Sequence, residues 1–267
     1  MISLIRPRLV IAEHTSLANA LETLSWYRRF LSKVAIATLY RFSDTLVAVS
    51  ADAARQMEKY ALLPKNTAIT IYNPIINEEL FRKSNLFFSH PFFEANANLF
   101  LSVGRISKEK DFPTLIAAFA ETLQVKPSRL IIAGDGPEMR MLEKLVKDLN
   151  LSDQIALLGH VNNPYPLYKY ADVFVLSSLR EGLPTVLIEA LALGCNVVST
   201  DVRSGPREIL RGGALGKLVP ASDIKSLAKA MIESVKKGEQ KTPSNDELKQ
   251  YGVNFAVDCY IKALNLK

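Results

Sequence analysis

The sequence of residues 173–200 is VFVLSSLREGLPTVLIEALALGCNVVST. Two short apolar runs, 173–176 and 196–200, flank a turn and a helical pattern over 184–193. Short apolar runs without alternation indicate strands that are buried on both faces. Because a helix between two such strands is the repeating unit of a parallel sheet, this stretch predicts an α/β fold with right-handed crossovers.

The same alternation begins near residue 98. Further strands are predicted at 99–103, 129–133 and 155–158, and further helices at 111–124, 138–149 and 166–171. This pattern predicts one complete doubly wound, Rossmann-like domain, whose ligand lies outside the carboxyl ends of the strands. Five loops follow those ends and are expected to line one crevice: 104–105, 134–136, 159–160, 177–181 and 201–205.

The first 75 residues predict a smaller region. Strands are expected at 9–12, 46–49 and 68–72, and helices at 17–42 and 51–60. Three strands are about half of a doubly wound domain. The residues Tyr72-Asn73-Pro74 predict a linker, and 246–264 predict an amphipathic helix that braces the fold. We therefore expect a partial domain at 1–75, a complete domain at 76–245 and a final helix within 246–267.

The composition is that of a globular protein with an excess of positive charge. The chain has 267 residues, 48% hydrophobic residues and a formal net charge of +6, which favours anionic ligands or an anionic membrane surface. No stretch is long and apolar enough for a signal peptide or a spanning helix. Cys195 and Cys259 stand in apolar surroundings, as expected for core thiols of a reduced, cytoplasmic protein.

Two glutamates are the strongest chemical signal. Glu181 lies in the turn after strand 173–176, and Glu189 lies about one turn inside a helix that we expect to begin at Pro184. Free amides at a helix start favour phosphate binding. Carboxylates on both sides of such a site suit a phosphate flanked by polyol groups, as in a nucleotide sugar.

A second motif occupies 102–111. Gly104 permits close approach of the backbone to a ligand, and Arg105 and Lys110 supply cations for phosphate oxygens. A solvated basic loop is the alternative, and the glutamates on a neighbouring loop favour the phosphate site.

Other residues leave two interpretations open. The run Gly134-Asp135-Gly136 is either a tight turn or part of the crevice, and it lacks the dinucleotide fingerprint because Met139 stands at the third glycine position. His160 and the loop 204–208 allow the same two interpretations. His14 follows strand 9–12 and is either structural or directed toward the crevice.

A stretch of alternating aromatic and basic residues runs from Trp26 to Lys33. Residues 1–41 contain six basic residues, Arg6, Arg8, Arg28, Arg29, Lys33 and Arg41, against Glu13 and Glu22. Such a helix either contacts an anionic membrane peripherally or buries its rings and solvates its cations. The sequence contains no Asp-x-Asp pair, no His/Cys cluster and no Walker loop, so neither a metal nor another cofactor is expected, and nothing indicates nucleic-acid binding.

These motifs, in this order, resemble the retaining GT-B glycosyltransferases of family 4. The resemblance covers most of 8–267 and is strongest over 98–238. Residues 102–111 resemble the donor-phosphate loop, 181–189 the paired-glutamate motif, and 204–210 members that build lipid-linked or surface polysaccharides. The segment 72–74 resembles the interdomain linker, and the final helix resembles one that crosses back to the first domain.

The resemblance implies a GT-B-like fold and a role for each residue of the motifs. Arg105 and Lys110 would bind the diphosphate, Glu181 the donor sugar, Glu189 the ribose, and His14 would stand near the transferred sugar. The residues implied in donor binding are Gly104, Arg105, Lys110, Glu181, Gly182, Leu183, Pro184, Thr185 and Glu189. The implied reaction transfers a sugar, with retention, from a nucleoside diphosphate sugar to a glycan or polyprenyl-linked acceptor, and a uridine diphosphate sugar is the expected donor.

One departure from the family bears on activity. Met1 stands well after the family's first strand and glycine-rich loop, so we expect about half of the first domain to be missing. The expected outcome is donor binding with weak transfer. The alternative is a non-catalytic or partner-dependent nucleotide-sugar-binding remnant. A nucleotide-dependent oxidoreductase is disfavoured because the glycine fingerprint fails.

Overall fold

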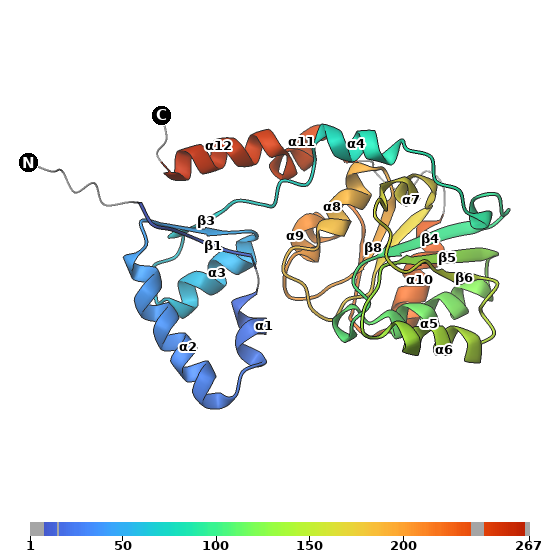
Figure 1. Ribbon diagram of the computed structural model, residues 1–267, viewed down its shortest axis with the longest axis horizontal. Helices are drawn as coiled ribbons and strands as arrows, with labels where there is room; N and C mark the ends of the chain where they lie inside the picture. Colours follow the sequence, from blue (N-terminus) through green and yellow to red (C-terminus); the bar gives the residue numbers. More distant parts are fainter. Residues whose placement is uncertain (1–7, 15, 236–242, 265–267) are drawn as a thin grey trace, which may run out of the picture. The chain divides into compact units, whose positions relative to one another are not determined.

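The computed structural model describes residues 8–14, 16–235 and 243–264. Their contacts divide the chain into two compact units (Figure 1). Unit 2 is Ile75–Lys249, and unit 1 combines Met1–Pro74 with Gln250–Lys267. The first division follows the expected linker, and the second lies shortly after the expected boundary at 245.

Unit 2 contains a six-stranded parallel sheet. Its strands are β4 (Asn98–Val103), β5 (Ser128–Ala133), β6 (Ile155–Leu157), β7 (Val173–Leu176), β8 (Asn196–Thr200) and β9 (Lys217–Val219). The order across the sheet is β6-β5-β4-β7-β8-β9, and each neighbouring pair is parallel. This is the doubly wound arrangement that the alternating sequence predicts.

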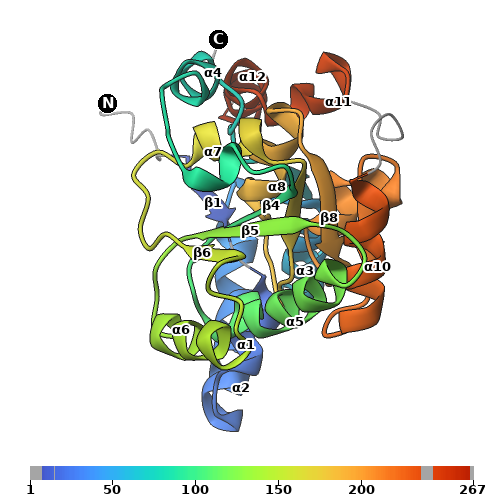
Figure 2. The ribbon, with the colours of Figure 1, turned by 90° about the vertical axis from the view of Figure 1, so that its right-hand side faces the viewer.

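Helices cover both faces of this sheet. They are α4 (Glu78–Ser84), α5 (Phe112–Leu123), α6 (Met139–Asp148), α7 (Tyr165–Tyr170), α8 (Thr185–Ala192), α9 (Pro206–Ile209) and α10 (Ile224–Ser234). Short 3₁₀ turns occur at Pro91–Phe93, Lys108–Lys110, Arg211–Gly213 and Lys249–Tyr251. Figure 2 shows α5, α6 and α10 on one face and α4, α7 and α8 on the other.

The core of unit 2 explains why its central strands are predominantly apolar. Every residue of β7 is buried, and Phe100 of β4 meets Phe119 of α5 edge to face, with ring centroids 6.1 Å apart. Met231 of α10 and Leu142 of α6 complete the same cluster. Because both faces are covered, the strands need apolar side chains in both directions.

Unit 1 is a smaller layered structure. Its strands β1 (Val10–Glu13), β2 (Thr45–Ala48) and β3 (Ala68–Thr70) are parallel, in the order β1-β2-β3. Its helices are α1 (Leu17–Glu22), α2 (Trp26–Leu39), α3 (Ala51–Tyr60) and α12 (Val253–Leu264), with a 3₁₀ turn at Tyr40–Phe42. In α12, Ala256 and Ala263 pack against Val47 and Ile71. The final helix therefore belongs to the core of unit 1.

Some expected elements differ from the structure. The single helix expected at 17–42 is wrong: α1 ends at Glu22, and α2 begins at Trp26. The guanidinium of Arg29 donates to the carbonyls of Leu21, Glu22 and Leu24, which satisfies the end of α1. The final helix begins at Val253 instead of 246, after a short helix α11 (Asn245–Leu248) that opens with a Ser244–Glu247 capping box.

Candidate functional site

The strand order of unit 2 reverses between β4 and β7. The chain proceeds from β4 to β5 and β6 on one side, and then from β7 to β8 and β9 on the other. In open α/β sheets, ligands bind where the order reverses, outside the carboxyl ends of the strands. The loop after β4 carries Arg105 and Lys110, and the loop after β7 carries Glu181. The topology therefore places the two sequence motifs at one position.

Lys110 and Glu181 are in direct contact there. The Nζ of Lys110 lies 2.6 Å from Oε1 of Glu181, and their side chains are 22% and 9% exposed. The hydroxyl of Ser178 donates to the same carboxylate oxygen at 2.6 Å. The pair offers a cation for an anionic group and an acceptor for hydroxyl groups at the same place.

Main-chain contacts tie the two loops together. The Ser177 hydroxyl donates to the carbonyl oxygen of Lys110 at 2.7 Å, and the Leu179 amide donates to the carbonyl oxygen of Glu109 at 2.7 Å. Ser177 and Ser178 are fully buried. The Ser177 hydroxyl and the Leu179 amide hold the loop after β7 against the loop after β4, a role that their sequence positions alone did not reveal.

Arg105 lies beside a hollow at the carboxyl ends of β4 and β5. The hollow has a volume of about 290 Å³, and it is lined by Val103, Gly104, Arg105, Ala133, Gly134, Asp135, His160, Val161 and Pro164. Arg105 is exposed. In the same hollow, Nε2 of His160 lies 3.1 Å from Oδ1 of Asn162. Arg105, Gly104 and His160 are thus brought together, as the crevice interpretation requires.

The glycines of the 134–136 turn pack against the loop after β4. A Cβ on Gly134 would lie 1.9 Å from the carbonyl oxygen of Gly104, and one on Gly136 would lie 2.1 Å from that of Ile106. Gly134 also has a φ of +151°, which disfavours other residues. The two glycines therefore serve close packing between loops, and Gly134 and Asp135 also line the hollow. A role of this turn in binding a nucleotide stays a prediction.

Helix α8 carries the second half of the glutamate motif. It begins at Thr185, with Pro184 as the N-cap residue instead of the expected first helical residue. Gly205, with a φ of +85°, packs on this start: its Cβ would lie 2.4 Å from Cδ of Pro184 and 2.7 Å from the carbonyl oxygen of Gly182. Because Leu183 and Pro184 are buried, they can contribute to a ligand only through the backbone.

Glu189 has a partner that the sequence did not indicate. The hydroxyl of Tyr168, on α7, donates to Oε2 of Glu189 at 2.8 Å. Burial raises the pKa of the Glu189 carboxyl, and the hydrogen bond from Tyr168 opposes that rise. Burial, followed by the neighbouring Glu189, raises the pKa of Tyr168 well above its usual range. The two residues stand on different crossover helices, so no local spacing could have predicted their contact.

His14 belongs to unit 1. It directly follows β1, at the carboxyl end of that strand, and its side chain is exposed. Its neighbour Glu13 accepts a hydrogen bond from Tyr40 at 3.2 Å. Burial and the Glu13 carboxylate raise the pKa of Tyr40 to about 12. The position of His14 at a strand end agrees with expectation, and its catalytic role stays a prediction.

Helix α2 exposes large apolar side chains. Trp26 is 82% exposed, Phe30 63% and Leu31 61%, and none of the described side chains of this helix is buried. The alternative of core aromatics is therefore wrong for this helix. Between Trp26 and Phe42 the sequence contains Arg28, Arg29, Lys33 and Arg41 and no acidic residue.

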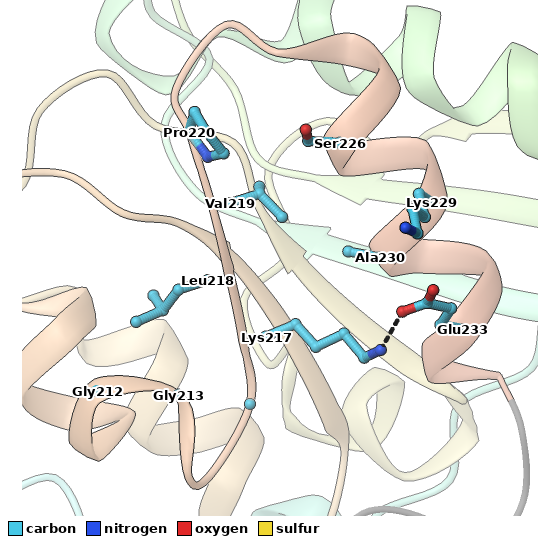
Figure 3. A pocket seen from close by; sticks show the side chains of 11 residues that line it. Gly212, Gly213, Lys217, Leu218, Val219, Pro220, Ser226, Lys229, Ala230 and Glu233 are labelled. Atoms are coloured by element: carbon cyan, nitrogen blue, oxygen red, sulfur yellow. Dashed lines mark hydrogen bonds and ion pairs between the residues drawn. The ribbon is translucent and has the colours of Figure 1, made fainter.

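A second hollow, of about 390 Å³, runs along β9 and α10 (Figure 3). Lys217 of β9 points toward Glu233 of α10, and the two form an ion pair. None of the site residues expected from the sequence lines this hollow. It is therefore separate from the Lys110–Glu181 site.

Within 8–14, 16–235 and 243–264, no three His, Cys, Asp or Glu side chains gather as metal ligands do. Over the same ranges, no helix combines the length and the apolar character that crossing a bilayer demands.

Comparison with known proteins agrees with this geometry. The sequence profile of the family described as glycosyl transferases group 1 matches residues 83–254. A 4-alpha-N-acetylgalactosaminyltransferase of Campylobacter jejuni, named for a diphospho-undecaprenol substrate, is 32% identical over 86% of this chain and 62% of its own length. An uncharacterized glycosyltransferase of Methanocaldococcus jannaschii is 34% identical over 64% of this chain and 43% of its own length.

Solved structures show the same fold. HepE of Anabaena, crystallised in complex with UDP, superimposes with a TM-score of 0.80 and 22% identity, over 97% of this chain and 72% of that one. Sucrose-phosphate synthase of Thermosynechococcus elongatus gives a TM-score of 0.72 at 21% identity, over 96% of this chain and 67% of that one. These neighbours are GT-B glycosyltransferases, and the expected fold class is confirmed. The chain spans 43% and 62% of the two curated relatives described above.

Proposed function

This chain belongs to the group 1 glycosyl transferases, and from that premise we propose that it transfers a sugar from a nucleoside diphosphate donor to a glycan or lipid-linked acceptor. The observation that carries the proposal is the contact between Lys110 and Glu181 where the strand order reverses. A nucleotide sugar presents a diphosphate next to a polyol, and this pair complements both groups.

We propose the following donor position. The diphosphate lies by Arg105, Lys110 and the backbone of Gly182–Thr185, with the donor sugar on Glu181 and the ribose on Glu189. Gly104 lets the diphosphate approach the backbone of the loop after β4. A uridine nucleotide is the first candidate, since HepE was solved with UDP.

Catalysis is proposed to depend on electrostatic stabilisation of the departing diphosphate. Negative charge grows on that group as the glycosidic bond breaks, and fixed cations with helix-start amides stabilise it without reorganisation. Arg105 and Lys110 therefore take the place of a metal ion in this proposal. We propose retention of configuration at the anomeric carbon and a role for His14 near the transferred sugar.

Calorimetry with UDP, GDP and ADP tests donor binding. The double variant Arg105→Ala/Glu189→Ala is expected to lose most of its affinity for UDP, because it removes one phosphate contact and one ribose contact. The double variant Arg140→Ala/Glu143→Ala is a matched control, since both residues are exposed on α6. Equal UDP affinity in the two double variants would remove the donor assignment.

Product analysis tests the chemistry. Proton NMR of the transferred sugar is expected to show the donor's anomeric configuration, and activity is expected to survive EDTA. An inverted product, or activity that EDTA abolishes and manganese restores, would contradict the proposed mechanism.

We also propose that α2 docks on an anionic bilayer at the inner face of the cytoplasmic membrane. Exposed Trp26, Phe30 and Leu31 suit the headgroup boundary, and each nearby cation contributes about 1 kcal/mol at such a surface. The diphospho-undecaprenol in the name of the Campylobacter relative supports a membrane-bound acceptor.

Vesicle sedimentation tests the docking surface. Trp26→Ala/Phe30→Ala is expected to abolish binding to phosphatidylglycerol vesicles, whereas Phe87→Ala, which alters an 89% exposed ring of unit 2, should leave it unchanged. Binding should weaken at high salt. Equal binding of the wild type to neutral phosphatidylcholine vesicles would overturn this part of the proposal.

A further inference from the structure

We propose that Tyr168 is a positioning residue for donor binding, which keeps the Glu189 carboxylate oriented for the hydroxyl groups of the donor ribose. The inference rests on the proposed function, because it assumes that Glu189 meets the ribose. It adds a residue that belongs to neither sequence motif and that is itself almost completely buried.

Tyr168 is held rigidly by its surroundings. Its ring stacks on Phe174 of β7, with centroids 5.4 Å apart and 29° between the planes. Its carbonyl oxygen accepts a hydrogen bond from Sγ of Cys195 at 2.8 Å, at the end of the turn that follows α8. Ring, backbone and hydroxyl are therefore each fixed, and the hydroxyl is fixed on Glu189.

The contact with Tyr168 fixes one oxygen of the Glu189 carboxylate and leaves the other available. Oε2 of the carboxylate accepts from Tyr168, and no described residue forms a hydrogen bond with Oε1. A carboxylate held at one oxygen has one side-chain orientation and retains acceptor capacity at the other oxygen. Such a group can accept hydroxyl hydrogen bonds without first losing side-chain entropy.

The contact with Tyr168 also favours the charged form of the Glu189 carboxyl. Accepting hydrogen bonds from two ribose hydroxyls requires the ionised carboxylate, but burial favours the neutral acid. The Tyr168 hydroxyl counteracts burial because it donates to the ionised form. Among the described residues, Tyr165 of α7 also interacts electrostatically with Glu189; Lys83 and Glu79 of α4 act on Tyr165, and Cys195 acts on Tyr168. None of these groups supplies Glu189 with a second described hydrogen bond.

Calorimetry with UDP and 2′-deoxy-UDP over a range of pH is the first test. Tyr168→Phe is expected to weaken UDP binding about tenfold, since hydrogen bonds to charged groups are the stronger ones, and to weaken 2′-deoxy-UDP binding less. The pH below which UDP binding falls should move upward. Tyr170→Phe is the matched control, because Tyr170 is 47% exposed on the same helix and stacks on Phe93.

A double-mutant cycle separates positioning from a general structural role. In a Glu189→Ala background, Tyr168→Phe should change UDP affinity less than twofold, because the side chain through which Tyr168 acts is gone. Carbon-13 NMR of the glutamate carboxyls, recorded without nucleotide, should show a higher pKa of Glu189 in Tyr168→Phe. Equal losses for both nucleotides, an effect that persists with Glu189→Ala, or an unmoved pKa would each overturn the inference.

The same measurements distinguish this inference from the proposed function. If Glu189→Gln weakens UDP binding and Tyr168→Phe does not, only the role of Tyr168 fails. If Glu189→Gln and the wild type bind UDP equally, or the wild type does not bind UDP, then the ribose assignment fails and the role of Tyr168 fails with it.

Discussion

Unit 2 and unit 1 each contain a parallel sheet, but the apolar side chains around the two sheets differ in how deeply they are buried. In unit 2, strands such as β7 are buried along their whole length, and helices cover both faces. In unit 1, no described side chain of α2 is buried, and Trp26 is 82% exposed. The comparison shows two uses of apolar residues: in unit 2 they hold polar loops in position, and in helix α2 of unit 1 they form a surface.

The largest expected effect tests how tightly the loops of unit 2 are packed. Gly134→Ala should lower the free energy of unfolding by more than about 4 kcal/mol, because its Cβ would lie 1.9 Å from a backbone oxygen. Gly159→Ala is the matched control: its φ is +66°, but no heavy atom lies within 4 Å of its Cβ. That control should lose about 1–2 kcal/mol. Urea unfolding measures both, and equal losses would refute tight loop packing.

A pair of identical substitutions compares the two units directly. Phe100→Ala removes a fully buried ring of unit 2 and should cost about 3–5 kcal/mol. Phe30→Ala removes a 63% exposed ring of unit 1 and should stay within about 0.5 kcal/mol. If thermal unfolding showed a large loss for Phe30→Ala, α2 would be part of a core and the contrast would disappear.

Ion pairs provide a smaller contrast. Lys110→Met leaves the 9% exposed Glu181 side chain without its cation, and it should cost about 2 kcal/mol. Much of that loss should return in Lys110→Met/Glu181→Gln. Arg55→Met breaks the 3.3 Å pair with Asp52 in unit 1, where Arg55 is 67% exposed, and it should change stability by less than about 0.5 kcal/mol. A double-mutant cycle without coupling between Lys110 and Glu181 would contradict this.

The smallest expected effect concerns pH. Because the pKa of Glu189 is raised in the folded protein, the folded state binds more protons than the unfolded state between the ordinary and the raised value. Stability therefore falls as pH rises through that window, and the deficit persists above it. Glu189→Gln should raise Tm at pH 8 by up to about 4 °C. Calorimetric scans should show this gain vanishing near pH 4, and a gain independent of pH would argue against the raised pKa.

The sequence predicted the parts of unit 2 whose signals are local. Its strands through β8 are marked by apolar runs, because both faces are buried. Strand β9 escaped this pattern, since it has three residues, begins with Lys217 and lies at the sheet edge. Helices α4 and α10 were also not expected, although Asn77 and Asp223 cap them with their side chains.

In the candidate site, too, the sequence predicted only those residues whose signals are local. Arg105, Lys110 and Glu181 were identified because loops at the carboxyl ends of neighbouring strands must converge, and Lys110 does contact Glu181. The hydrogen bond between Tyr168 and Glu189 depends on how two helices pack on the sheet, so strand and helix patterns contain no information about it. The break between α1 and α2 was missed because the segment Thr23-Leu24-Ser25 lacks glycine and proline.

The missing side chains at Gly134 and Gly205 also affect the entropy of ligand binding. The carbonyl oxygen of Gly104 fills the space that a side chain at 134 would need, and Pro184 does the same at Gly205. The crevice loops therefore cannot shift separately without breaking backbone contacts. At the proposed site, a donor would then need to immobilise side chains such as Arg105, at about 0.5–1.5 kcal/mol each, and not whole loops. The backbone of the crevice is preorganised because Gly134 and Gly205 lack the Cβ atoms that would keep the loops apart.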